Sequence, residues 1–356
     1  MTFDTLGIGA SPLMLMRAAN IATQGKRVLL CDRSPSIGGA WAAPDLLGLA
    51  NVENGVHLLE NRPSLLSALR DDLKVDMAPS PCFGLLAGRR TSMPVTRVLL
   101  QAGAGWNALV RGELDKATRS FRSALRASLN LGAGFYYPAE GASAFIRALY
   151  KRFVDAGGEV RSGVEVSKIE VVDGGARSIT TAGVFETSTV LLASRAFAPV
   201  VIDRELQQTK VEVSRCRTAI LRIRGSTHFE GGYVEILADG ALKRARDLSQ
   251  FVRPGIGSDE RILCVQFRHA FPHDDWRLGE DILHRLRRLS LIAPGAALTD
   301  VCRSDIEVLT LTDHALRRLA LRSGGVIGSL RTTDFAEGFV SDFRQVATRP
   351  RSRQAA

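Results

Sequence analysis

The sequence has few cysteines, and their arrangement suits neither disulfides nor a metal site. The 356 residues include five of them: Cys31, Cys82, Cys216, Cys264 and Cys302. They are widely spaced, odd in number and without a Cys-X-X-Cys pair, which disfavours both a disulfide framework and a zinc site. We expect no bound metal. Cys31, Cys216 and Cys264 lie in strand-like runs, so we expect them to be small core residues.

Long apolar runs are also missing. No stretch of the chain approaches the ~20 consecutive apolar residues of a membrane-spanning helix, so we expect no membrane span. The first residues do not resemble a signal peptide, because Asp4 comes early and the apolar stretch after it is interrupted by glycines and Pro12. We therefore expect a cytoplasmic protein.

Acidic residues are outnumbered by basic ones. The chain has 47 Lys and Arg against 37 Asp and Glu, a net charge of +10, and only seven of the basic residues are lysines. Such a charge is compatible with nucleic-acid binding, but no groove-reading motif accompanies it. We expect no nucleic-acid partner. Binding of a small-molecule substrate with a phosphate or carboxylate explains the positive charge better than nucleic-acid binding does. A solvated basic surface is a still simpler explanation.

What the chain does contain is a dinucleotide-binding pattern in its first forty residues. Residues 3–8 form a predicted buried strand, and Gly7 and Gly9 lie at the turn after it, where the backbone must bend and let a pyrophosphate approach. Ser11 is suited to cap a helix that begins at Pro12. The first-turn amides and the positive end of that helix would face the phosphates.

A second strand, predicted over Lys26–Asp32, completes this unit. Asp32 follows Gly9 by 23 positions, close to the ~20-residue offset of the acid that binds a ribose hydroxyl. Pro12 stands where the full pattern has a third glycine, so we expect the helix to lie slightly differently against the strand. A nucleotide-free α/β unit is the alternative, but the glycine turn lies between two strands with the acid in place.

The segment that follows favours one cofactor. Asp-Arg-Ser-X-X-X-Gly-Gly-X-Trp, residues 32–41, resembles an extension found in the two-dinucleotide-binding-domain flavoprotein superfamily, which includes amine-oxidase-like proteins and UDP-galactopyranose mutases. The resemblance implies FAD as the cofactor. The backbone of Gly38, Gly39 and Ala40 would approach its pyrophosphate and ribityl chain, and Arg33 would lie near the adenosine. Trp41 would either flank the cofactor or pack in the core.

A short run after this unit suggests residues beside the flavin. Gly55–Glu60 resembles the Gly-X-His-X-Phe-His stretch of UDP-galactopyranose mutases, with His57 on its first histidine and Glu60 in place of its second. The resemblance implies that His57 lines the flavin pocket, and it makes His57 and Glu60 the candidate catalytic residues. A structural role for His57 is the alternative.

A third block of the sequence also resembles a cofactor-binding segment. Residues 137–175 resemble amine-oxidase-like and phytoene-desaturase-like flavoproteins, in which the valine that corresponds to Val166 lays its backbone against the adenine.

The last block is Ser323–Phe335, which resembles a mutase segment in its spacing. The matching positions are Gly324, Gly325, Gly328 and Asp334. The resemblance implies that Gly328, Asp334 and Phe335 lie near the ribityl chain and the isoalloxazine, where the start of a helix would stabilise the reduced flavin. Val326 and Leu330 replace the arginine and tyrosine of the mutases, which argues against a true galactopyranose mutase.

These blocks predict an α/β fold with two domains. A Rossmann-like FAD-binding domain would be assembled from residues 1–63, 134–195 and 300–345. An α+β substrate domain would combine a mostly helical insertion, 64–133, with an antiparallel sheet in 196–299. Residues 346–356 form a basic tail. The candidate substrate residues lie on the predicted strands: Arg222, Tyr233, Glu235, Arg244, Arg246 and Arg268.

Three functions stay open at this point. We favour an FAD-dependent oxidoreductase of the amine-oxidase-like class that transfers a hydride from a small or medium organic substrate to flavin N5. The first alternative is a redox-neutral flavin enzyme that acts on a nucleotide sugar. The second is a non-catalytic partner protein with a flavoprotein fold. The sequence leaves the oligomeric state open, with a homodimer as one option.

Overall fold

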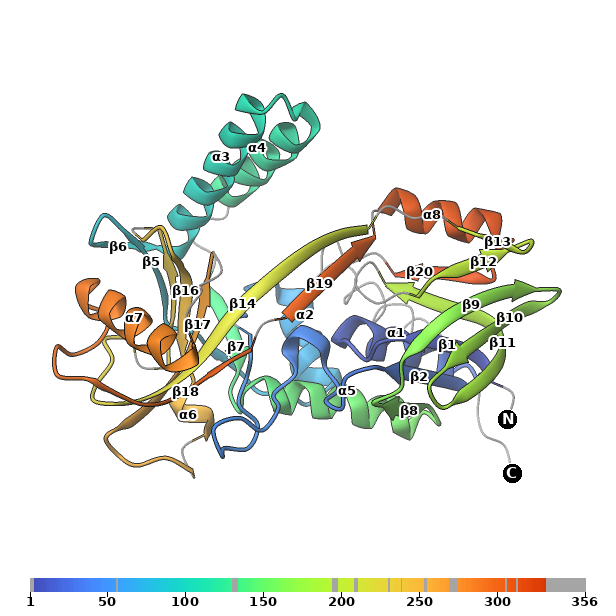
Figure 1. Cartoon of the computed structure of the whole chain (residues 1–356), viewed down its shortest axis with the longest axis horizontal. Helices are drawn as coiled ribbons and strands as arrows, with labels where there is room; N and C mark the ends of the chain where they lie inside the picture. The colour runs from blue at the N-terminus through green and yellow to red at the C-terminus, as the bar shows by residue number, and fades with distance from the viewer. Residues whose placement is uncertain are drawn as a thin grey trace.

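The computed structural model describes residues 3–55, 57–129, 134–193, 198–207, 211–229, 231–237, 239–252, 255–268, 274–304, 306–311 and 313–330. Within this part of the chain, a nine-stranded sheet and an eight-stranded sheet form the two halves of the molecule (Figure 1). A third, smaller sheet has three strands.

The nine-stranded sheet has a parallel centre. Its order there is β8 (Glu159–Ser162), β2 (Val28–Asp32), β1 (Phe3–Ile8) and β11 (Gly183–Ala193). β20 (Ile327–Leu330) comes from the far end of the chain and pairs in parallel with the second half of β11. Strands from three distant chain segments therefore meet in one sheet, as a dinucleotide-binding domain of the predicted kind requires.

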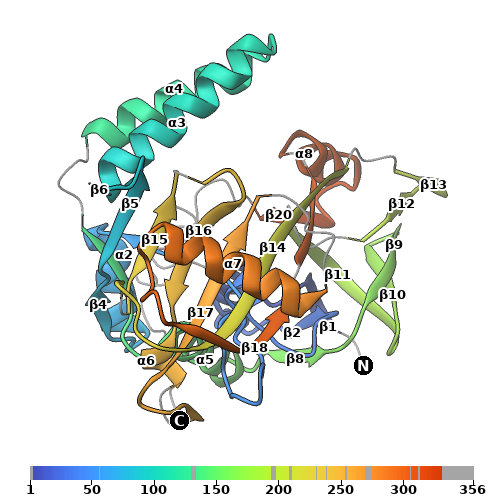
Figure 2. The ribbon, with the colours of Figure 1, turned by 60° about the vertical axis from the view of Figure 1, so that its left-hand side comes forward.

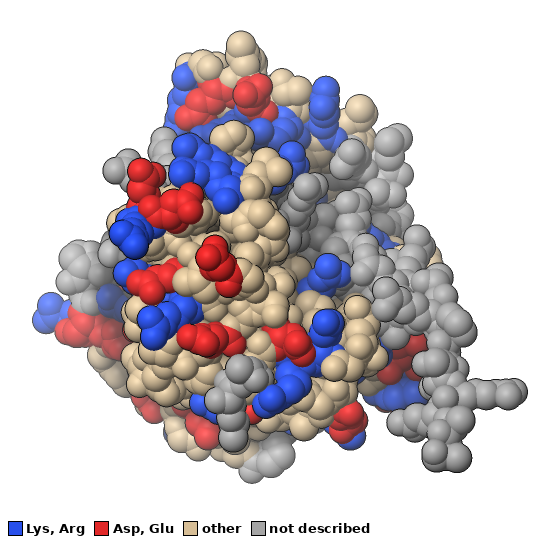
Figure 3. Space-filling model, turned by 90° about the vertical axis from the view of Figure 1, so that its right-hand side faces the viewer, with Lys and Arg blue, Asp and Glu red and all other residues tan. Residues whose placement is uncertain are grey.

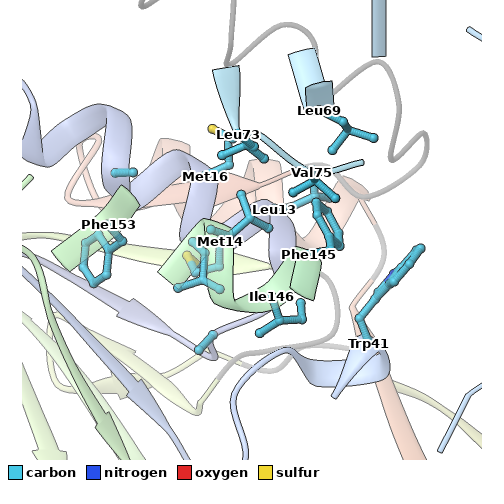
Figure 4. Close-up of a cluster of buried hydrophobic side chains, with 14 of the residues drawn as sticks. Leu13, Met14, Met16, Trp41, Leu69, Leu73, Val75, Phe145, Ile146 and Phe153 are labelled. Carbon is cyan, nitrogen blue, oxygen red and sulfur yellow. The ribbon is translucent and has the colours of Figure 1, made fainter. Parts of the chain in front are cut away.

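Helices and a β-meander cover this sheet. α1 (Pro12–Ala22) and α5 (Ala142–Asp155) pack on one face, where Figure 4 shows their side chains gathered in one cluster with Trp41 at its edge. The strands that extend the sheet beyond β11 are β10 (Gly175–Thr180), β9 (Val166–Val172), β12 (Val200–Ile202) and β13 (Glu205–Leu206). Residues of this meander and of α8 (Asp313–Arg322) line the core on the other face.

The close fit of α1 depends on a residue that has no side chain. A Cβ on Gly7 would lie 2.5 Å from Leu30 Cδ2 and 3.0 Å from Met14 Sδ. Met14 is completely buried, and full burial of such a side chain contributes about 1.5–3 kcal/mol. Gly7 therefore sets the distance between helix and sheet, and with it the position of the start of α1.

The eight-stranded sheet is mostly antiparallel. Its order is β18 (Ala297–Arg303), β14 (Val211–Arg224), β17 (Glu260–Phe267), β16 (Leu242–Asp247), β15 (Tyr233–Ile236), β5 (Cys82–Leu86) and β6 (Arg89–Ser92). β19 (Ile306–Leu311) pairs with the first half of the long β14, and these two strands run between the halves of the molecule in Figures 1 and 2. α7 (Asp275–Arg288) covers the outer face of this sheet. The inner face packs against residues 49–52 and β7 (Phe135–Pro138).

Smaller elements complete the described chain. β7 pairs with β3 (Leu59–Glu60) and β4 (Met77–Pro79), and α2 (Pro63–Ser67) continues into the helical turn Ala68–Asp72. A 3-10 turn spans Gly39–Trp41, and α6 (Ser249–Val252) follows β16. α3 (Met93–Val110) and α4 (Leu114–Leu129) form a hairpin that projects from the body (Figures 1 and 2).

The predicted helical insertion, 64–133, contains α3 and α4, but it also contains strands that were not predicted. These are β4, β5 and β6, within residues 77–92. Positive φ angles at Ala87 and Gly88 make the tight turn between β5 and β6, and β5 is held by pairing with β15, about 150 positions later in the chain. Such long-range pairing leaves no local periodicity.

Two sets of strand pairings cross predicted domain boundaries. β12 and β13, residues 200–206, join the nine-stranded sheet, although they follow the middle segment of the predicted FAD-binding domain, residues 134–195. β18 and β19, residues 297–311, pair with β14 instead of joining the last segment of that domain. The physical reason for the pairing is the same in both cases. The unpaired N–H and C=O groups at the edge of a sheet accept any strand that can reach them, whatever its position in the sequence.

Candidate functional site

The turn between β1 and α1 presents backbone groups to an anion. Gly9 has a φ of +85°, and its N–H donates to the carbonyl oxygen of Cys31 at 2.7 Å. Ser11 caps α1, accepting the N–H of Met14 at 3.4 Å, and no acidic residue lies in the first turn. No acidic side chain of α1 itself therefore compensates the positive end of the helix. Pro12 is buried as the first helical residue and removes one amide from this turn.

The second glycine pair lies over this turn. Gly38 has a φ of +114° and donates its N–H to the carbonyl oxygen of Ala10 at 2.9 Å. Gly39 has a φ of +58° and is exposed, and a Cβ on it would lie 3.4 Å from the Cβ of Ser11. Residues 9–11 and 38–40 therefore meet with only small side chains between them. This cradle fits a pyrophosphate, so the residues present fit FAD.

Asp32 ties the turn to the end of β2. Its carboxylate oxygens accept the N–H groups of Ala10 at 2.7 Å and Ser34 at 2.8 Å, and the side chain is buried. Each oxygen keeps a further lone pair, which suits it to accept a ribose hydroxyl as well. The carboxylate therefore has a structural role in addition to the predicted contact with FAD.

The predicted adenosine end is assembled around the same residue. Val164 donates its N–H to the carbonyl oxygen of Asp32 at 2.9 Å, which sets the segment that leads into Val166 beside β2. Val166 is buried as the first residue of β9, and Arg33 is exposed. A cavity of about 370 Å³ opens next to this point, between residues 35–37, α5 and β8.

The C-terminal block is only partly within the described residues. Gly328 lies in β20, where a Cβ would be 2.9 Å from Leu191 Cδ2, so the glycine lets β20 pack beside β11. Val326 and Leu330 pack against the two cores that flank the sheet. Asp334 and Phe335, predicted to lie near the flavin, fall outside the described residues.

His57 holds the glycine-rich segment in place. Its ring stacks on Trp41 with centroids 4.5 Å apart and planes 11° apart, and its Nε2 lies 2.5 Å from the carbonyl oxygen of Ala40. Because a carbonyl only accepts, Nε2 carries the hydrogen. Burial lowers the pKa of His57 from 6.5 to about 4, so the ring is neutral at neutral pH. This geometry makes His57 a positioning residue for Ala40 and Trp41.

A buried arginine connects the two halves of the molecule behind this stack. Arg246, on β16, is 1% exposed and donates from Nη1 to the carbonyl oxygen of His57 at 2.8 Å. Its guanidinium lies 3.5 Å from the centroid of the Tyr137 ring, and Tyr137 in turn lies parallel to Trp41 with centroids 6.0 Å apart. Arg246, Tyr137, Trp41 and His57 therefore form one continuous stack, in this spatial order.

Glu53 completes this buried group. Its carboxylate accepts the Tyr137 hydroxyl and, at 2.7 Å, the N–H of Ala142 at the start of α5. Burial raises the pKa of Glu53, and the positive charge of Arg246 opposes that rise. Sequence reasoning did not identify Glu53 or Tyr137, because a single buried polar residue produces no spacing pattern.

The inner face of the eight-stranded sheet carries a row of polar side chains. The strand register aligns Glu235, Arg244, Gln266 and Thr218 on four neighbouring strands. Residues in register point to the same face of a sheet. Arg244 forms an ion pair with Glu235 at 3.8 Å. We call these four residues the polar row.

A second row runs beside it, nearer to His57. Its members in register are Tyr233, Arg246, Cys264 and Ile220. The Tyr233 hydroxyl donates to Glu235 and so links the two rows. Burial raises the pKa of Tyr233, which keeps its hydroxyl protonated as a donor. All five cysteines of the chain are free thiols, and burial raises the pKa of Cys82 and Cys302 to about 11.

The remaining predicted residues are engaged by partners outside the polar row. Arg222 forms a bidentate pair with Glu260, at 2.7 and 3.1 Å, which raises the pKa of Arg222. Arg268 donates to the carbonyl oxygen of Ile236 at 2.8 Å. Glu60, predicted as a catalytic candidate, binds Arg62 and Arg97. Tyr233, Glu235, Arg244 and Arg246 are therefore the predicted substrate residues that the fold brings together.

The positive charge of the chain is accompanied by acidic side chains on the face of the molecule that Figure 3 presents. Figure 3 shows basic and acidic side chains interspersed over the described part of the face that it presents. This distribution agrees with a solvated surface there.

Comparison with known proteins agrees with this geometry. The family described as "FAD dependent oxidoreductase" matches residues 15–310. No curated protein matches the chain. Among solved structures, putrescine oxidase bound to putrescine superimposes with a TM-score of 0.64 at 13% identity, covering 98% of this chain and 99% of that one. Reduced UDP-galactopyranose mutase gives 0.64 at 14% identity, covering 92% and 88%.

A further match is an oxidoreductase from Methanosarcina mazei, with a TM-score of 0.56 at 15% identity over 84% of this chain and 87% of that one. At such identities the structural matches show the fold alone. They confirm the predicted flavoprotein fold, and the family match confirms the predicted oxidoreductase and its FAD.

Proposed function

The chain belongs to the family of FAD dependent oxidoreductases, and we propose that it oxidises a C–N or C–C bond of a small or medium organic molecule, with an amine as the preferred class. Bound FAD supplies a ring that accepts a hydride at N5. The chain's own contribution is to bind and orient the substrate and to exclude water.

The polar row is the observation that carries this proposal. It places a carboxylate, a guanidinium, an amide and a hydroxyl on one rigid sheet face, in register across Glu235, Arg244, Gln266 and Thr218. Such a surface suits a substrate with separate positive and negative groups, because Glu235 would bind an ammonium and Arg244 a carboxylate. Arg244 is 26% exposed and Glu235 6% exposed in their side chains, so water competes weakly with such contacts.

The second row supports the first. Tyr233 donates to Glu235, which limits that carboxylate to one orientation. Arg246 fixes the backbone at His57, and His57 fixes Ala40 beside the second glycine pair. The binding surface and the cofactor cradle are thus joined by a short series of direct contacts, which is the arrangement that precise positioning of substrate against cofactor requires.

A redox-neutral reaction on a nucleotide sugar is the weaker proposal. Val326 and Leu330 stand where UDP-galactopyranose mutases carry an arginine and a tyrosine, and both pack into apolar cores. These positions offer no polar group to a sugar nucleotide.

The test begins with the purified flavoprotein under anaerobic conditions. A panel of primary and secondary amines, with and without a carboxylate, is mixed with it while the absorbance of oxidised flavin is followed. We expect at least one amine to bleach the flavin, and we expect aerobic turnover to consume an electron acceptor in proportion to product. Turnover that needs reduced flavin and consumes no acceptor would overturn the proposal in favour of the redox-neutral reaction.

A further inference from the structure

The hairpin of α3 and α4 has its large apolar side chains on the outside. The two helices pack through small residues, and Gly105, Ala108, Ala117 and Ala124 are all buried. A Cβ on Gly105 would lie 2.9 Å from the Phe121 ring, so the close approach of the helices depends on that glycine. In a helix pair that faces water on all sides, the large apolar residues are expected at the seam instead.

Exposed apolar side chains lie along the hairpin, at Val95, Leu99, Phe121 and Leu125, and four more lie close together where the hairpin ends. Trp106 is 62% exposed, Val110 72% and Leu114 65%, with Leu109 beside them. They flank the turn at residues 111–113, where Gly112 has a φ of +74°. Figures 1 and 2 show that this turn is the part of the hairpin farthest from the body of the protein. We call residues 106–114 the tip.

The hairpin is also basic. Residues 93–129 contain six basic residues and two acidic ones, a net charge of +4, and α3 itself has no acidic residue. Arg111, on the tip, and Arg119 and Arg122, on the first three turns of α4 behind it, are exposed. An anionic surface is the natural complement of such a combination of apolar tip and basic flank.

We propose that the tip inserts into the headgroup region of an anionic lipid bilayer. A seam of small residues with large apolar residues outside is the pattern of helix pairs whose surroundings are apolar. Tryptophan favours the membrane–water interface. No helix of the described chain has the length and hydropathy needed to cross a bilayer, so insertion is shallow and the body stays outside.

A second copy of the chain is a poorer occupant for this surface. Pairing two tips would bring together two hairpins that each carry a net charge of +4, and like charges at an interface oppose association. A bilayer avoids this cost, since each basic side chain near it meets anionic headgroups. The proposal does not depend on the substrate proposed above.

The first experiment measures binding of the full-length holoprotein to vesicles. We expect sedimentation with vesicles of phosphatidylcholine that contain phosphatidylglycerol, and weak sedimentation with phosphatidylcholine alone. The triple variant W106S/V110S/L114S should lose binding by at least about 10-fold, because each buried apolar side chain contributes to it. The triple variant R111Q/R119Q/R122Q should bind anionic vesicles on the order of 100-fold more weakly.

A matched control uses exposed apolar residues elsewhere. Leu206 is 62% exposed, Trp276 51% and Leu321 82%, and all three lie outside the hairpin. The variant L206S/W276S/L321S removes comparable apolar area and should bind vesicles like the wild type. Equal loss in both serine variants would overturn the proposal, since binding would then follow general apolar exposure. Flavin absorbance and thermal midpoint, expected to be unchanged in all variants, show that each remains folded.

Fluorescence locates the contact. In a W276F background, the emission of Trp106 should shift to shorter wavelength on binding and should be quenched by lipids brominated near the headgroup, while buried Trp41 gives a constant signal. Binding without a change at Trp106 would overturn the proposal. Loss of a dimer in the W106S/V110S/L114S variant, measured by sedimentation velocity without lipid, would assign the tip to a second copy instead.

Discussion

The two large sheets hold two kinds of site. At the predicted cofactor site, the nine-stranded sheet would offer FAD mainly backbone groups: the helix end at Ser11, the turn at Gly9 and the second pair at Gly38 and Gly39. At the proposed substrate site, the antiparallel sheet would offer mainly side chains, which strand register brings together from four strands. A backbone site needs particular residues at fixed local spacing, and a side-chain site needs only an alignment of distant strands. A backbone site can therefore be predicted from a sequence, and a side-chain site of this kind cannot.

The largest expected effect tests the contact between the two sites. Arg246→Ala removes the donor to the carbonyl of His57 and the group stacked on Tyr137, and it leaves buried Glu53 without a nearby positive charge. We expect a loss of about 4 kcal/mol in the free energy of unfolding, measured by urea denaturation. Arg222→Ala removes a solvent-accessible ion pair with Glu260 and should cost less than about 1 kcal/mol. Similar losses for both variants would mean that the two sites are not joined through Arg246.

The next effect concerns the cofactor side. Asp32→Ala removes the acceptor for the N–H groups of Ala10 and Ser34, and with it the fixed shape of the phosphate turn. We expect FAD to bind roughly 100-fold more weakly, as the loss of two hydrogen bonds to a charged group implies. The measurement is FAD titration of the apoprotein. Asp32→Asn keeps one acceptor oxygen, so its FAD affinity should lie between those of the wild type and Asp32→Ala. An unchanged FAD affinity in Asp32→Ala would remove this residue from the cofactor site.

A smaller effect is expected on the substrate side. Arg244→Ala removes the positive member of the polar row, and we expect flavin reduction by a carboxylated amine to need about 10–50-fold more substrate, with FAD affinity unchanged. Anaerobic stopped-flow measurements of the reduction rate against substrate concentration give this value. Arg222→Ala is the matched control, because that arginine is held by Glu260. Equal effects of the two substitutions would remove the polar row from substrate binding.

The smallest effect is a dependence of stability on pH. The pKa of His57 falls from 6.5 to about 4 on folding, so the unfolded chain binds the proton more tightly than the folded one between these values. Its contribution to stability is complete above pH 6.5 and is lost as the pH falls towards 4, by about 1–2 kcal/mol after allowance for the partial exposure of the ring.

Glu53 acts in the opposite direction, since its raised pKa favours the folded state as the pH falls. The contribution of His57 is therefore measured as the difference between the wild type and His57→Gln at each pH. Glutamine keeps a donor for the carbonyl of Ala40 but does not titrate. A difference that is constant from pH 7 to pH 4 would contradict the assigned neutral ring.

The prediction from sequence succeeded where backbone geometry dictates residue type. The glycine turn, the cap at Ser11 and the position of Asp32 predicted the first βαβ unit, and the family match confirms the FAD. The strands β4, β5 and β6 inside the predicted helical insertion were not predicted, because β5 is defined by a partner about 150 positions away. Glu53 and Tyr137 left no signal, since burial and not spacing sets their roles. The roles of the individual site residues, the domain boundaries and the cytoplasmic location stay predictions.

The place of β20 in the nucleotide-binding sheet has a consequence for biosynthesis. β1 and β2 are among the first strands to leave the ribosome, but β20, which completes the edge of the sheet beside β11, begins only at Ile327. At about 5–20 residues per second, translation of the intervening segment takes roughly 15–60 s. β1 gains both of its neighbours, β2 and β11, by residue 193, but the sheet is complete only when most of the chain has been made.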